Sequence, residues 1–146
     1  MITISTANDV VREAAKFGAC SKSGSVTDWK SLCWLFFSPQ GREFCEDNNF
    51  PSIEMFRDMK DNVRKFGVHV DSGLIFLENE ANVGIIGNTE AHLTYTDNTK
   101  VYKVVLMHSG KAHIVLKGYS VVLIERTEGC EVIIDKDKTA RVLWQR

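Results

Sequence analysis

The 146-residue chain lacks the close cysteine pairs that build zinc ribbons and redox motifs. Such sites need two cysteines on one tight turn, because that spacing preorganises the metal site or the disulfide. The four cysteines, Cys20, Cys33, Cys45 and Cys130, instead lie twelve or more residues apart. An isolated cysteine is usually a small buried hydrophobic residue. We therefore interpret all four as structural thiols and expect neither a metal nor another cofactor.

The chain also lacks an excess of charge of either sign, a long apolar run and a secretory leader. Lys and Arg together number 18, and Asp and Glu together number 19. Sequence-independent binding of nucleic acid, by contrast, depends on clustered basic charge. No run of 18 apolar residues is present to span a membrane. Residues 1–5 lack the basic start and the cleavage site of a signal peptide. These absences predict a cytoplasmic protein with no membrane partner and disfavour nucleic acid as a partner.

A repeat occupies the second half of the sequence. Four blocks each open on a small residue and carry an aliphatic residue at the third position and a large apolar residue at the fifth, starting at residues 73, 91, 112 and 130. A second apolar run follows in each block, at residues 83–86, 104–107, 121–124 and 142–144. Alternation with a period of two is typical of β-strands, and two strands in blocks of nearly fixed length indicate a solenoid.

Residues 1–67 carry the signals of a helical cluster. Capping residues precede four amphipathic stretches, and the fourth, residues 53–66, is expected to form one helix that Gly67 ends. Aromatic residues recur at helical spacing, which favours a packed core over a ligand pocket. They are Trp29, Trp34, Phe36, Phe37, Phe44, Phe50 and Phe56. Because the first coil of a solenoid needs a polar cover, we expect this cluster to cap the repeat.

These patterns predict an α+β chain of two regions packed as one unit. Residues 1–67 form a helical N-terminal cap, and residues 68–146 form a short β-solenoid of about four coils. A β-sandwich or jelly roll with N-terminal helices is the alternative, because strands every nine or ten residues also fit that fold. Strand pairing distinguishes the two. A solenoid pairs Leu93 with Ile114 and Ile114 with Val132 in parallel, whereas a meander pairs strands that are adjacent in sequence antiparallel.

Six short segments carry a resemblance to other proteins. They are SPQGREFC at 38–45, NNFPS at 48–52, GVHVD at 67–71, GNTEAHLTY at 87–95, VVLMH at 104–108 and AHI at 112–114. With these segments, roughly residues 30–143 resemble small uncharacterised proteins encoded by gut anaerobic bacteria and their phages, a group with no assigned activity. The resemblance implies a phage or prophage accessory role by association, and it transfers no catalytic residue.

Three histidines of the repeat are candidates for a common site. His92 and His113 hold the second position of consecutive blocks, so stacked coils would place them one above the other, facing outward and about 5 Å apart. His108 follows the second strand of its block, on a turn. A tetrahedral zinc site needs a fourth ligand, and the neighbouring blocks offer Leu74 and Glu131 at the equivalent position. We therefore interpret the three as a surface histidine ladder without a metal.

Two alternative functions stay open. The segment 39–60 has the length of a helix-turn-helix and would contact DNA through Arg57 and Lys60, although carboxylates share its second helix. Phosphate-loop, His-Glu-x-x-His and Gly-x-Ser-x-Gly motifs are absent, but carbohydrate-active solenoids carry their carboxylates without any local motif. A glycan-active enzyme would place such carboxylates beside residues 96–100, where the longest block has its extra residues.

The last coil favours a non-enzymatic assembly or binding protein. It ends at Val142, Leu143 and Trp144 without a polar capping segment. An uncapped coil exposes strand edges and apolar side chains, which a partner or another copy of the chain then covers. We expect residues 130–146 to form such an interface, centred on Trp144, because tryptophan is enriched at interface hot spots.

Overall fold

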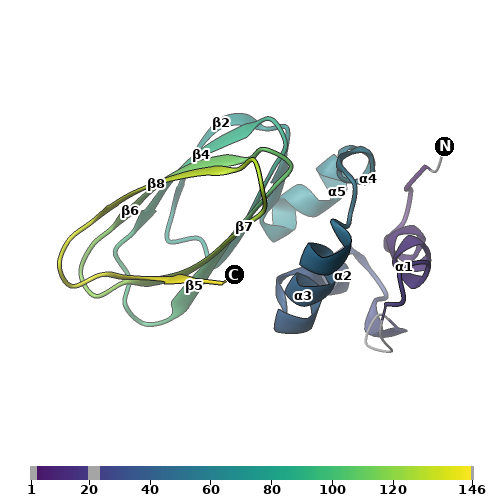
Figure 1. Cartoon of the computed structure of the whole chain (residues 1–146), viewed down its shortest axis with the longest axis horizontal. Helices are drawn as coiled ribbons and strands as arrows, with labels where there is room; N and C mark the ends of the chain where they lie inside the picture. The colour runs from purple at the N-terminus through teal and green to yellow at the C-terminus, as the bar shows by residue number, and fades with distance from the viewer. Residues whose placement is uncertain (1–2, 20–23, 146) are drawn as a thin grey trace. The chain divides into compact units, whose positions relative to one another are not determined.

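The computed structural model describes residues 3–19 and 24–145 and divides into two compact units, one ending at Val68 and one beginning at His69 (Figure 1). The first unit is helical and the second is a parallel β-solenoid of about four turns, which confirms the predicted fold class. Cys20 lies outside the described residues. In the parts of the chain that are described, no helix has the length and apolar character needed to cross a membrane.

The helical unit contains five α-helices and a terminal 3-10 helix within its described residues: α1 (Ala7–Ala15), α2 (Trp29–Phe37), α3 (Pro39–Asn48), α4 (Ile53–Asp58), α5 (Lys60–Val63) and η2 (Arg64–Phe66). Side chains close the first turns, as the sequence predicts. Thr6 and Asp9 form a capping box on α1, and the Ser38 hydroxyl accepts the Gly41 amide at the start of α3. Each cap satisfies an amide that the helix itself leaves unpaired.

The prediction of one helix over residues 53–66 is wrong, because this segment forms three short helices. Met59 adopts φ −99° and ψ 8°, which separates α4 from α5, and η2 then ends at Gly67 with φ 93°. The burial expected for Trp34 is also wrong, since this side chain is 72% exposed. Phe36 and Phe56 are buried as expected, and their rings meet edge to face at 5.9 Å.

The solenoid unit consists of two parallel sheets whose strands alternate along the chain. The odd sheet contains β1 (Val68–Val70), β3 (Asn82–Ile86), β5 (Val101–Met107), β7 (Val121–Arg126) and β9 (Arg141–Trp144) in that order. The even sheet contains β2 (Gly73–Glu78), β4 (Thr89–Tyr95), β6 (Lys111–Leu116) and β8 (Glu131–Lys136) in that order. Each strand pairs with the strand two places along the chain, which excludes the sandwich and the meander.

The core lies between the two sheets and is built from columns of equivalent residues. Leu93 stacks on Ile114 and Val104 on Ile124, and all four side chains are at most 1% exposed. Polar side chains join the corners of successive coils. The Asn79 side chain accepts the Thr96 amide at 2.9 Å, and the Asp137 carboxylate accepts the Gly118 amide at 3.0 Å.

The expected register is correct in the middle of the solenoid and wrong by two residues at both ends. Leu93 pairs with Ile114 as predicted, but Ile114 pairs with Ile134 rather than Val132. In the first coil Ile75, not Gly73, pairs with Ala91. A shift of two preserves which face each side chain occupies, so alternation alone cannot reveal it.

Candidate functional site

The last coil of the solenoid leaves two strand edges open within the described residues. β8 is the terminal strand of the even sheet and β9 is the terminal strand of the odd sheet, so each pairs on one side only. An edge strand presents its unpaired amides and carbonyls to any strand that can align with it. We refer to β8, β9 and their side chains as the tail of the solenoid.

The stacked core residues are less buried at the tail than in the middle coils. Val83, Val104 and Ile124 form one column and are each fully buried, whereas Trp144, the next residue in that column, is 50% exposed. The partly buried side chains that pack against the core all belong to the first or the last coil: Ile75, Leu77, Val132, Ile134 and Val142. The core of the even sheet is therefore partly exposed at both ends of the solenoid. The core of the odd sheet is partly exposed at β9 only, because Val68 and Val70 of β1 are buried.

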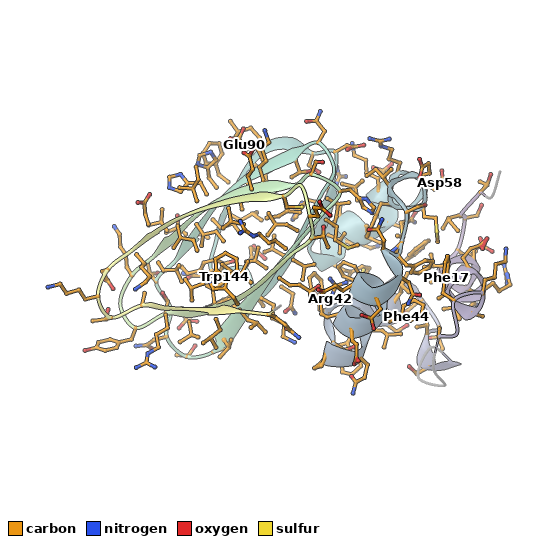
Figure 2. All side chains as sticks on the ribbon, viewed as in Figure 1. Phe17, Arg42, Phe44, Asp58, Glu90 and Trp144 are labelled. Carbon is orange, nitrogen blue, oxygen red and sulfur yellow. The ribbon has the colours of Figure 1, made fainter. Side chains whose placement is uncertain are left out.

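Trp144 lies between the two sheets rather than on the outer surface (Figure 2). Its ring has the Arg126 guanidinium 5.2 Å from its centroid, a cation–π arrangement. Leu143 points to the opposite, outer side of β9 and is 47% exposed, and Val142 is half-buried. The three predicted interface residues are thus together at the tail, where they line a shallow hollow. Its other lining residues are the apolar Ile134 and Ala140 and the basic Lys136 and Arg141.

The outer face of the even sheet carries an aromatic and aliphatic ladder that we call the outer ladder: Phe76, His92, His113 and Ile133. The Phe76 and His92 rings stack with centroids 5.0 Å apart, and His92 and His113 follow at 5.5 Å. The neighbours expected for the histidines, Leu74 and Glu131, are wrong because of the register shift. Phe76 and Ile133, which end the ladder, are 70% and 63% exposed.

The two histidines of the outer ladder face outward, as predicted. His113 Nε2 lies 2.5 Å from Asp135 Oδ2, and His108 lies on the turn after β5. Among the described residues, no group of His, Cys, Asp and Glu side chains has the arrangement of metal ligands. Cys33, Cys45 and Cys130 are buried, in agreement with a structural role.

The residues of the two alternative functions are separated or engaged in local contacts. Arg57 lies on α4 and Lys60 begins α5, so the break at Met59 places them on different short helices. In the turn at residues 96–100, the Asp97 carboxylate accepts hydrogen bonds from the hydroxyls of Tyr102 and Thr99, and these bonds lower the pKa of Asp97. The Asp97 carboxylate is therefore a hydrogen-bonded part of this turn.

Sequence analysis missed the two apolar residues that end the outer ladder. A signal for Phe76 was present, since residues 74–77 are apolar without alternation and such a strand is apolar on both faces. Ile133 lies in a similar run at residues 132–134. Comparison with known proteins adds no further site residue: no protein-family model, no curated protein and no solved structure matches the chain.

Proposed function

We propose that the chain is a non-enzymatic assembly protein that self-associates through the tail of its solenoid. The observation that carries the proposal is the change along the core columns, from fully buried in the middle coils to 50% exposed at Trp144. Each coil of a solenoid buries its core face against the next coil. A tail that continues onto another copy would cover Trp144 and supply hydrogen-bond partners to the open strand edges.

The partner edge that fits the tail best is β2, at the opposite end of a second copy. If the observed stacking continues in parallel from β8 to β2, Ile133 meets Phe76 on the outer face. On the inner face, the same register places Val132 against Ile75 and Ile134 against Leu77. Three consecutive apolar pairs would then extend both the outer ladder and the core. Beside these apolar pairs, the same register places Asp135 opposite Glu78, which is a pair of like charges.

Tail-to-tail pairing fits less well. Two β8 strands that run antiparallel within one sheet must pair inward residues with inward residues. Centred on Ile133, this arrangement opposes Glu131 to Asp135 twice, and like charges directly opposite each other are destabilising. Centred on Ile134, it opposes Lys136 to Val132 twice. Head-to-tail stacking is therefore the arrangement that we propose, and such an interface does not close on itself.

A phage or prophage accessory role is the context that the resemblance implies, and we propose it on that basis alone. A chain that stacks head to tail suits such a role, because an open interface builds extended assemblies from one small subunit. The outer ladder would then run along the assembly as a continuous stripe.

Molar mass in solution tests the proposal. Size-exclusion chromatography with light scattering at two protein concentrations should give masses above 16.5 kDa that grow with concentration, because open stacking has no preferred end point. A mass of 16.5 kDa at both concentrations would contradict self-association. A mass that stops at twice this value would contradict the head-to-tail arrangement and favour the closed tail-to-tail pair.

A further inference from the structure

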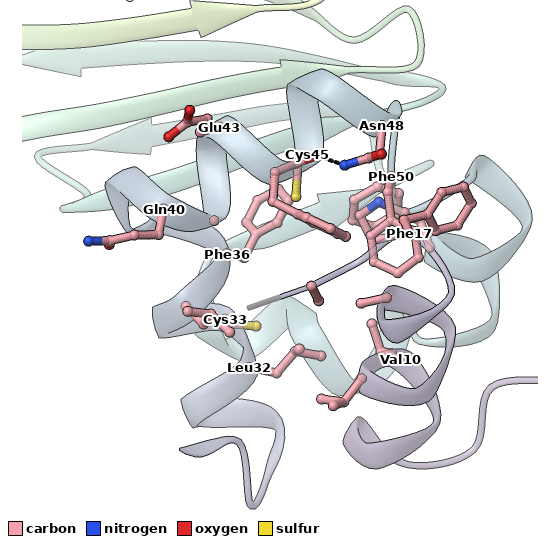
Figure 3. Close-up of a pocket in the computed structure, with 18 of the residues that line it drawn as sticks. Val10, Phe17, Leu32, Cys33, Phe36, Gln40, Glu43, Cys45, Asn48 and Phe50 are labelled. Carbon is pink, nitrogen blue, oxygen red and sulfur yellow. Dashed lines mark hydrogen bonds between the residues drawn. The ribbon is translucent and has the colours of Figure 1, made fainter. Parts of the chain in front are cut away.

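The helical unit contains a cavity of about 340 Å³ that is open to solvent on one side (Figure 3). Its walls come from α1, α2, α3 and the segment from Phe50 to Val68. Val10 of α1 lies on one side, and Leu32 and Cys33 of α2 lie across from it. Ala14 of α1 also lines the cavity. A well-packed core holds few voids larger than a water molecule. A space of this size is in the range of pockets that hold small molecules.

The cavity wall is predominantly apolar and rich in aromatic rings. Phe17, Phe36, Phe44, Phe50 and Phe56 all line it. The rings of Phe17 and Phe44 each lie 5.6 Å from that of Phe50, and Phe17 is 53% exposed. Apolar cavities of smaller size stay dry and take up apolar guests such as benzene. The wall chemistry therefore suits an apolar guest with aromatic rings.

The charged residues of the cavity wall are acidic. Glu43 and Asp47 line the cavity, and among the described residues no Lys, Arg or His does so. Both acidic residues are exposed, so they lie toward solvent at the margin of the cavity. The amide of Asn48 donates to the Phe44 carbonyl at 2.9 Å. An anionic guest such as a fatty acid would lose its hydration without gaining a cationic partner.

We propose that the helical unit binds an uncharged aromatic molecule of two to three rings in this cavity. The guest would replace empty space by contacts with the phenylalanine rings, and its affinity would come from apolar burial and edge-to-face packing. A cavity in a helical unit of this size is costly to maintain, because each uncovered apolar group weakens the fold. Binding should therefore also stabilise the unit.

A matched pair of fluorescent probes tests the charge and the apolar character of the guest. N-phenyl-1-naphthylamine is uncharged, and 8-anilino-1-naphthalenesulfonate has the same ring system with one sulfonate added. The uncharged probe should bind at least about tenfold more tightly, because the cavity offers no cation to the sulfonate. Equal affinity for the two probes, or no binding of the uncharged one, would overturn the proposal.

Two alanines on one helix locate the binding site. Ala14 is buried and lines the cavity, whereas Ala15 is exposed and does not line it. Ala14→Leu fills part of the cavity and should weaken binding of N-phenyl-1-naphthylamine about tenfold or more, and Ala15→Leu should leave it unchanged. Equal weakening, or none in either variant, would place the probe elsewhere and overturn the assignment. Circular dichroism establishes whether each variant keeps its helices.

Cysteine protection keeps the proposal testable if Ala14→Leu fails to fold. Cys33 lines the cavity, and burial raises the pKa of its thiol to about 12. Cys130 is a buried thiol of the solenoid unit and serves as the internal control. In the unmodified chain, N-phenyl-1-naphthylamine should slow alkylation of Cys33 several-fold without slowing that of Cys130, as peptide mass mapping would show. Equal rates at Cys33 with and without the probe would overturn the proposal.

Discussion

Truncation of Trp144 to alanine is expected to weaken self-association and the fold by similar amounts, because the side chain is 50% exposed in the single chain. An aromatic side chain presents roughly 200 Å² of surface, so about 100 Å² is buried in the solenoid and about 100 Å² is left for the next copy. At about 25 cal/mol per Å² of apolar surface, each half contributes about 2.5 kcal/mol.

Two assays separate these effects. A loss of about 2.5 kcal/mol at the interface corresponds to a dissociation constant about sixtyfold higher, which sedimentation equilibrium over a dilution series would measure. Urea unfolding, at a concentration where the parent chain is monomeric, should show a loss of about 2 kcal/mol for Trp144→Ala, because alanine keeps part of the buried surface.

Tyr119 provides the matched control. It is 67% exposed and lies in the turn between β6 and β7. Its backbone amide donates to Thr139 Oγ1 in the turn between β8 and β9, and alanine keeps this amide. Tyr119→Ala should change neither the dissociation constant nor the free energy of unfolding by more than about 0.5 kcal/mol. The reasoning would be refuted if Trp144→Ala assembled with the parent's dissociation constant, or if Tyr119→Ala weakened assembly as strongly.

Three further predictions concern stability, each measured by urea unfolding. Ile114→Ala in a fully buried column should cost about 3 kcal/mol, and Ile134→Ala in the half-buried last coil of that column about half as much. The buried Tyr95 hydroxyl has no hydrogen-bond partner among the described residues, so Tyr95→Phe should raise the free energy of unfolding by about 1 kcal/mol. Hydrogen bonds from Thr139 and from backbone amides lower the pKa of Asp137 from 3.8 to about 2. The stability that Asp137 contributes is therefore present above about pH 4 and lost as the pH falls toward 2, and Asp137→Asn should flatten that part of the pH profile.

Much of the fold follows from local patterns in the sequence. Period-two alternation locates the strands, and capping residues such as Thr6 and Ser38 locate helix starts, because both signals depend on residues that are near in sequence. The register of the end coils depends on the lengths of turns, and a shift of two leaves the alternation unchanged. This is why Cys130 is mistaken for the partner of Ala112, which pairs instead with Val132.

The candidate site is predictable only in part. Val142, Leu143 and Trp144 are found from the sequence because the last apolar run follows the repeat. The outer ladder depends on the register, so Phe76 and Ile133 become its ends only once the strands are paired. The cavity depends on how the helices pack in three dimensions, and the same aromatic pattern fits a filled core.

The most direct test of head-to-tail assembly uses two variants, each blocked at one end. Ile133→Lys places a charge at the tail, and Phe76→Lys places one at the opposite end; both side chains are exposed, so the fold should tolerate the changes. We predict that each variant alone is a 16.5 kDa monomer by light scattering. A mixture of the two should form a dimer of twice that mass. The intact tail of the Phe76→Lys variant can pair with the intact β2 edge of the Ile133→Lys variant, and no further copy can add. A mixture that stays monomeric, or a Phe76→Lys variant that assembles like the parent, would contradict the account.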